Sequence, residues 1–317
     1  MRNVFAAAAA WAGARTAFAL ATLVDVRNAA PAPLGASMAV TIDGKIVGDI
    51  GAGCYESEIV EAAMTTASDG IARVLDLDLT SDDIVLGSNG CGGFLRVVTW
   101  KPASDFARTA AAIVAGRSDA GVTISYDYEG NAREFTATFP ARRELIIVGG
   151  TTLAQEIASI AARLDFRTIV VDPRPSFATP ERLSAVDEII VAWPEDALPG
   201  MLTARTPLLV ISHDPKLDIP ALRAGLASET PYIGLLGSRR AQDGRRSALR
   251  FEGVSEEALT RIHGPVGLDL GGITMAETAV SILAEIVAEE RGRSGGPLLR
   301  HSGTIHNVER RTERSLR

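Results

Sequence analysis

The chain has 317 residues, of which 46% are apolar and 22% are charged, and its formal net charge is −7. This balance is typical of a globular protein of about two domains of ~100–200 residues each, and it excludes wholesale disorder. The acidic charge argues against a nucleic-acid-binding protein, because such proteins meet phosphates with basic patches.

The first segment, MRNVFAAAAAWAGARTAFALATLV, has two interpretations. A short apolar run after Arg2 is typical of a secretory signal. Alanine is also the best helix former, and FALATLVDV has the pattern of a buried strand. We favour a helix at 3–13 followed by a strand at 17–26. No stretch has the ~18–20 uncharged apolar residues of a membrane span. Two cysteines in the whole chain fit a reducing cytoplasm.

The rest of the first half predicts a mixed α+β domain. A turn rich in proline and glycine precedes strands near 37–42 and 45–50, which the DGK sequence joins as a hairpin. The further predicted elements are a helix at 55–68, strands at 72–79 and 94–100, a helix at 103–116 and a hairpin at 122–139.

The second half changes character at residue 144. ELIIVGG is a continuous apolar run, the kind of strand that a parallel sheet buries on both faces. A predicted helix at 152–164 is followed by apolar strands in RTIVVD, EIIVA, PLLVIS and PYIGLLGS, and the last strong helix is TMAETAVSILAEIVAEERG. This alternation predicts a Rossmann-like, doubly wound parallel sheet. We expect domains at 1–138 and 139–292, with a basic, solvated tail at 293–317.

The first strand, turn and helix of this sheet carry an altered dinucleotide fingerprint. Against the pattern G-x-G-x-x-G/A, Gly149 supplies the first glycine, Ala154 is an allowed third residue, and Thr151 replaces the middle glycine. Asp172, about twenty residues on, stands where an acid binds a ribose hydroxyl. Because a side chain at 151 fills the approach of a pyrophosphate, we do not expect NAD(P) binding. Arg174 is either a phosphate ligand or a surface arginine that pairs with Glu181.

The two cysteines both lie in glycine-rich segments, Cys54 in IGAGCYES after Gly53, and Cys91 in NGCGGF before Gly92 and Gly93. Glycine allows a bulky ligand to approach the backbone, and a thiol just before a helix favours the thiolate, which binds soft metals. A shared ligand site, two inert buried cysteines and a disulfide all remain open. Zinc is disfavoured because no histidine is near either cysteine in the sequence.

Several of these motifs, taken together, resemble the XdhC/CoxI family. GAGCYESEIVEAA and CGG resemble its two cysteine motifs, and YIGLLGSRR and GPVGLDLGGITMAETAVSILAEI resemble its Rossmann half. The resemblance covers about residues 10–306. The chain departs from the family pattern at Gly149–Thr152, where many relatives read G-A-G-H, and at Thr274–Glu277, where they often have T-P-x-E.

The resemblance implies an accessory chaperone without turnover. Such proteins bind molybdenum cofactor, in some cases in its cytosine dinucleotide form, and deliver it to an apo molybdenum hydroxylase such as xanthine dehydrogenase or carbon monoxide dehydrogenase. Some are linked to sulfuration of the cofactor, with a cysteine desulfurase as partner. The family members are often dimers. We therefore expect a cytoplasmic homodimer of this kind.

The resemblance also implies the site residues. Cys54 and Cys91 would contact the molybdenum, with Gly53, Glu56, Gly92 and Gly93 beside them. Gly237, Ser238 and Arg239 match the family's G-S-R stretch, and Glu277 matches an acid of the last helix. Glu56 is better explained as stabilising the start of its helix. The anion site is either the helix start near 152 or the GSRR loop at 237–240, where Arg239 and Arg240 either grip phosphate or are simply exposed.

Two rival interpretations remain. An NAD(P)-dependent oxidoreductase on the same fold would use Gly149 and Asp172, with His213 as the best-placed histidine near a strand end. A protein that sulfurates the cofactor would carry a persulfide on one of the two cysteines.

Overall fold

The protein is described from a computed structural model, in which residues 2–27, 32–51, 55–78, 93–300 and 302 are described. Cys54, Cys91, Gly53 and Gly92 lie outside these residues, as do most of the basic tail and part of the predicted turn after the first strand. The chain forms two compact units, Met1–Arg142 and Arg143–Arg317. The predicted boundary at 138/139 falls one residue before the end of a strand, β7.

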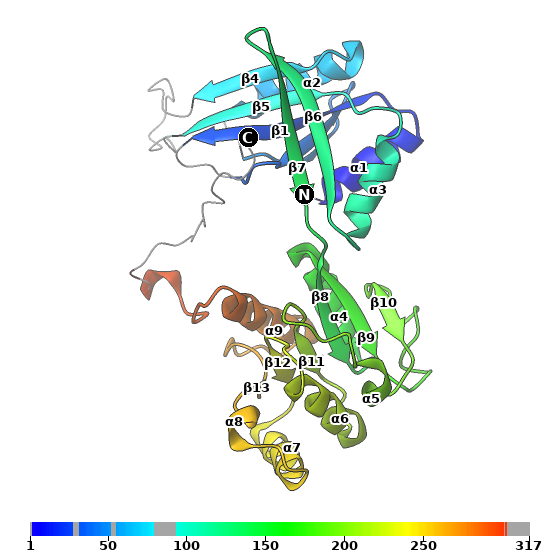
Figure 1. The fold of residues 1–317 in the computed structure, drawn as a ribbon, viewed down its shortest axis with the longest axis vertical. Coiled ribbons are helices and arrows are strands. Elements are labelled where there is room, and N and C mark those ends of the chain that lie inside the picture. The colour runs from blue at the N-terminus through cyan, green and yellow to red at the C-terminus, as the bar shows by residue number, and fades with distance from the viewer. Residues whose placement is uncertain (1, 28–31, 52–54, 79–92, 301, 303–317) are drawn as a thin grey trace. The chain divides into compact units, whose positions relative to one another are not determined.

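The N-terminal unit is a mixed α+β structure (Figure 1). Its helices are α1 (Arg2–Gly13), α2 (Glu56–Asp69) and α3 (Phe106–Ala115). Its strands are β1 (Phe18–Arg27), β2 (Ser37–Thr41), β3 (Ile46–Gly48), β4 (Arg73–Asp78), β5 (Phe94–Trp100), β6 (Ala120–Tyr128) and β7 (Asn131–Phe139). The elements predicted from the sequence are found with their ends shifted by a few residues.

An antiparallel sheet in the order β3-β2-β1-β5-β4 forms the centre of this unit, and β6 and β7 form a separate hairpin. Alternate residues of β1 point to opposite faces, as in any strand. Leu20 and Val24 pack with α1 and α3, whereas Ala21 and Leu23 pack with α2. The helix predicted at the N-terminus therefore covers one face of the sheet, because it buries Val4, Phe5 and Ala8 there.

The C-terminal unit alternates strands and helices throughout. Its strands are β8 (Arg143–Val148), β9 (Phe166–Val171), β10 (Glu188–Ile190), β11 (Leu208–Val210), β12 (Ile233–Leu235) and β13 (Ile262–His263). Its helices are α4 (Thr152–Ala161), α5 (Pro194–Ala197), α6 (Pro215–Leu226), α7 (Arg239–Phe251), α8 (Glu256–Leu259) and α9 (Met275–Glu290), with short 3-10 turns at Ala162–Leu164 and Leu298–Arg300.

All six strands are parallel, in the order β10-β9-β8-β11-β12-β13. This is the doubly wound Rossmann order, which reverses direction between β8 and β11. Leu145 and Ile147 of β8 pack on the face that α4 and α9 cover, and Ile146 and Val148 pack on the face of α6 and α7 (Figure 1). The structure therefore confirms the predicted fold class. In the described part of the chain no helix combines the length and the hydropathy of a membrane span.

Candidate functional site

The carboxyl edge of the parallel sheet at β8 and β11 is the expected ligand position of this fold, because a crevice opens where the strand order reverses. Three predicted site segments reach this edge: the turn after β8 at Gly149, the end of β9 at Asp172, and the end of β12 at Gly237. His213 also follows β11 here, exposed and with φ of 61°.

The glycine turn after β8 packs against the protein's own backbone. Gly149 has φ of 118°, and a Cβ atom there would lie 2.8 Å from both the Cα and the N atom of Ser212. A Cβ atom on Gly150 would lie 2.7 Å from the carbonyl oxygen of Phe177. The two glycines are therefore required for the chain to pass close to itself. The space that a pyrophosphate uses in dinucleotide enzymes is bordered here by residues 173–177.

Asp172, the predicted ribose ligand, is fully buried and bonded within the chain. Its Oδ2 accepts hydrogen bonds from Gly150 N–H at 2.7 Å and from Arg174 Nη2 at 2.6 Å. Its Oδ1 accepts two more from the backbone and side chain of Arg174, both at 2.9 Å. Burial opposes ionisation, but these donors outweigh it and lower the pKa of Asp172 below its usual value. Arg174, which also lies 4.0 Å from the Phe177 ring centre, therefore pairs with Asp172 and not with Glu181.

Thr151, which replaces the middle glycine, is the N-cap of α4. Its Oγ1 accepts a hydrogen bond from Ala154 N–H at 3.2 Å. The side chain thus satisfies one of the helix's free amides, which would otherwise be available to an anion. The departure from the fingerprint has a structural role in this chain.

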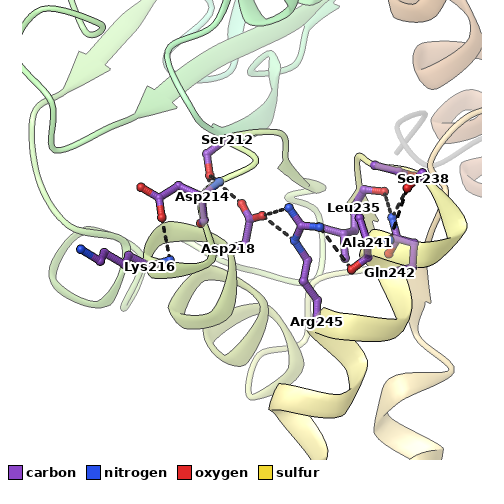
Figure 2. Close-up of polar contacts among 10 residues, drawn as sticks. Ser212, Asp214, Lys216, Asp218, Leu235, Ser238, Ala241, Gln242 and Arg245 are labelled. Atoms are coloured by element: carbon purple, nitrogen blue, oxygen red, sulfur yellow. Dashed lines mark hydrogen bonds and ion pairs between the residues drawn. The ribbon is translucent and has the colours of Figure 1, made fainter.

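Beyond the predicted residues, a buried polar network joins β11, α6 and α7 (Figure 2). Asp218 is 1% exposed and accepts hydrogen bonds from Ser212 Oγ at 2.6 Å and from Arg245 Nε at 2.6 Å. Arg245 is 8% exposed, and its Nη2 lies 2.5 Å from Asp218 Oδ2. The pair fixes α7 to α6 beneath the loops of the carboxyl edge.

Gln242 supports the loop after β12 from below. Its Nε2 donates to Leu235 O at 2.9 Å (Figure 2), whereas its Oε1 is buried without a hydrogen-bond partner among the described residues. A Cβ atom on Gly264 would lie 2.4 Å from this Oε1. Gln242 therefore fills the space beside Gly264 and holds the end of β12 in place.

The GSRR loop forms the N-terminus of α7. Gly237 has φ of 137°, and the side chain of Ser238 caps the helix by accepting from Ala241 N–H at 3.3 Å. Arg239 and Arg240 follow in the first turn, and both are exposed. A helix N-terminus next to two exposed guanidinium groups is suited to an anion.

In the N-terminal unit, two of the predicted residues are described. Glu56 is the first residue of α2, where its charge favours the helix dipole, and Tyr55 holds the N-cap position. Gly93 is buried directly before β5. Among the residues with described positions no group of three His, Cys, Asp or Glu side chains could hold a metal ion. The predicted soft-ligand site at Cys54 and Cys91 remains a prediction.

Sequence reasoning missed the pair Asp218–Arg245 and the support from Gln242. The two charged residues are 27 positions apart and match no short motif. The pattern of α7 offers the one usable signal, because Gln242, Arg245 and Leu249 share its buried face.

Comparisons with known proteins assign the two units. A family model described as the XdhC Rossmann domain matches residues 145–286, and one described as the XdhC and CoxI family matches residues 11–78.

Three curated relatives span most of this chain. "Uncharacterized protein YqeB" of Escherichia coli (strain K12) is 27% identical over 95% of this chain, which spans only 48% of that relative's length. "Molybdenum cofactor insertion chaperone PaoD" of the same organism is 27% identical over 85% of this chain and 82% of its own. A probable xanthine dehydrogenase subunit of Bacillus subtilis (strain 168) is 25% identical over 84% of this chain and 92% of its own.

The fold also has a solved counterpart. A crystal structure described as a xanthine dehydrogenase (BH1974) from Bacillus halodurans superposes with a TM-score of 0.71 at 24% identity, over 93% of this chain and 98% of that one. This likeness concerns the fold alone. Both halves of the chain match models of the same family, in the expected order, and the chain therefore belongs to the XdhC and CoxI family.

Proposed function

We propose that this protein is an accessory chaperone that binds molybdenum cofactor and delivers it to an apo molybdenum hydroxylase of the xanthine dehydrogenase or carbon monoxide dehydrogenase type. The observation that carries the proposal is the similarity to PaoD, whose name describes a molybdenum cofactor insertion chaperone, over 85% of this chain. In this role the protein acts in the cytoplasm by binding and release, without turnover.

The geometry of the carboxyl edge supports this role over that of a nicotinamide-dependent oxidoreductase. A dinucleotide needs a free acid for its ribose and an open glycine turn for its pyrophosphate. Here Arg174 binds the acid Asp172, and the backbone of Phe177 borders the turn. In this role Gly149 and Asp172 shape the edge and do not contact a nucleotide.

The parts of the cofactor differ in chemistry, and different residues suit each part. Thiolates suit molybdenum, so we assign the metal end to Cys54 and Cys91, with their neighbouring glycines giving access. The phosphate suits the N-terminus of α7, at Gly237, Ser238 and Arg239. A cytidine extension would add a second phosphate to the same end.

Anoxic titration of the purified protein with molybdenum cofactor tests the proposal. We expect Cys54→Ala and Cys91→Ser each to weaken binding. We expect the double variant Arg239→Glu/Arg240→Glu to weaken it by about tenfold or more, since charge-assisted hydrogen bonds to phosphate are lost. Arg205→Glu is the matched control, because it reverses an exposed arginine that precedes β11, at the opposite edge of the sheet.

Transfer is measured separately, as the activity gained by an apo hydroxylase on mixing with the loaded protein. Unchanged cofactor affinity in both cysteine variants would remove the thiols from the proposal. Failure of the unmodified protein to bind cofactor at all would overturn it. Mass spectrometry after incubation with a cysteine desulfurase tests the sulfuration role, since it detects an added sulfur on Cys54 or Cys91.

A further inference from the structure

The last helix, α9, is apolar on two opposite faces. Its inner face packs against the parallel sheet through residues at most 1% exposed: Ala279, Ile282, Leu283 and Ile286. Its outer face carries a second row at helical spacing, the α9 stripe, formed by Ala276, Val280, Ala284 and Val287. Val280 is 45% exposed. A helix that is apolar all round is normally covered on both sides, so the stripe lacks a partner within the described chain.

Further apolar side chains extend the stripe at both of its ends. Six of the fifteen large hydrophobic side chains that are exposed in the described chain belong to this stretch: Leu270, Ile273, Met275, Val280, Leu298 and Leu299. Ile273 is 94% exposed just before the helix, and Leu299 is 97% exposed after it. Single exposed apolar residues are ordinary, but a concentration of this kind marks an interaction surface.

A hollow lies beside the protruding Ile273. It has a volume of about 270 Å³ and is lined by Leu270, Gly271, Gly272, Ala276, Glu277 and Val280. The same patch thus offers both a projecting apolar side chain and an apolar hollow. A two-fold symmetric contact requires this, because one surface must fit a second copy of itself.

The charges on α9 indicate how two copies would pair. Glu277 and Arg291 are both exposed, and each is seven residues from Ala284. If two α9 helices pack antiparallel with Ala284 on the two-fold axis, Glu277 of each copy lies opposite Arg291 of the other. The antiparallel arrangement also pairs opposite ends of the helix dipoles. A parallel pairing would place like charges together.

We propose that the α9 stripe is a homodimer interface, in which two copies of this chain pack antiparallel along α9 over a seam of about 24 Å, the length of 16 residues at 1.5 Å each. Alanine and glycine at the contact permit close approach of the helices, to about 8 Å between axes. Ile273 of each copy fills the hollow of the other. The interface stands on the surface of α9 and is independent of the cofactor role.

A cysteine on the symmetry axis tests the register directly. In the full-length Ala284→Cys variant, the two introduced thiols meet each other, at a Cβ separation suited to a disulfide of about 3.8 Å. Mild oxidation is expected to give a covalent dimer, with a 284–284 link identified by peptide mass spectrometry. The control is Ser247→Cys, an exposed position of α7, which is expected to give no such link.

A charged residue in the seam tests the interface without a covalent link. Val280→Asp is expected to raise the dimer dissociation constant by about a hundredfold in sedimentation experiments, because it buries an unpaired charge. Val191→Asp is the matched control, since Val191 is 53% exposed outside this surface. Arg291→Glu leaves the apolar row intact and is expected to weaken the dimer most at low salt.

Three results would each overturn the proposal. The first is a monomer at micromolar concentration for the unmodified protein. The second is a dimer that Val280→Asp and Arg291→Glu leave unchanged while circular dichroism shows both variants folded. The third is a dimer in which Ala284→Cys forms no 284–284 link.

Discussion

The buried pair of Asp218 and Arg245 allows a quantitative prediction. Arg245→Met removes both donors of the guanidinium that Asp218 accepts, at 2.6 and 2.5 Å, and leaves a carboxylate that is 1% exposed with Ser212 Oγ as its remaining side-chain donor among the described contacts. Breaking a buried pair in this way costs about 3–5 kcal/mol. At roughly 2–4 °C per kcal/mol for a unit of this size, the melting temperature of the C-terminal unit should fall by about 6–20 °C.

Urea unfolding, monitored by hydrogen exchange of peptides from residues 208–251, measures the loss in the correct unit. The double variant Asp218→Leu/Arg245→Met should recover most of the stability, because it leaves no unpaired charge. Arg250→Met is the control, since Arg250 pairs with Glu256 on the surface of the same helix and should leave the unfolding midpoint nearly unchanged. A loss below about 1 kcal/mol in Arg245→Met would refute the reasoning, because a desolvated carboxylate cannot lose its cation so cheaply.

Three further changes should have distinct outcomes. Gly149→Ala should destabilise the unit by about 2 kcal/mol or more, measured as a lower melting temperature, because its Cβ would clash with the Ser212 backbone at positive φ. The hydrogen bond to Glu285 raises the pKa of His263 above 6.5, against the opposing effect of burial. That stabilisation is complete below pH ~6.5 and is lost as pH rises through the raised folded pKa, so His263→Gln should flatten the melting temperature between pH 6 and 9. Thr151→Gly restores the middle glycine of the fingerprint but should not produce micromolar NADH binding in a fluorescence titration, since Asp172 stays bonded to Arg174; saturable binding would contradict the account of the carboxyl edge.

Local patterns in the sequence determined the order and type of most elements. Continuous apolar runs such as ELIIVGG can only be buried on both faces, which requires a parallel sheet with helices on each side, and the structure has this arrangement. The family was likewise readable from short motifs, because their residues are contiguous in the chain.

What the tertiary structure decided is how distant residues share one environment. The fingerprint presented Asp172 as a free acid, but a loop that folds back places Arg174 and Phe177 against it and against the glycine turn. No spacing rule joins Asp218 to Arg245, because their contact depends on how α6 packs against α7. Likewise, the periodicity of α9 shows that it is apolar on two sides, but only packing reveals which side the sheet covers and which side remains exposed. Sequence patterns report what a residue prefers, whereas burial and pairing depend on which other parts of the chain are brought beside it.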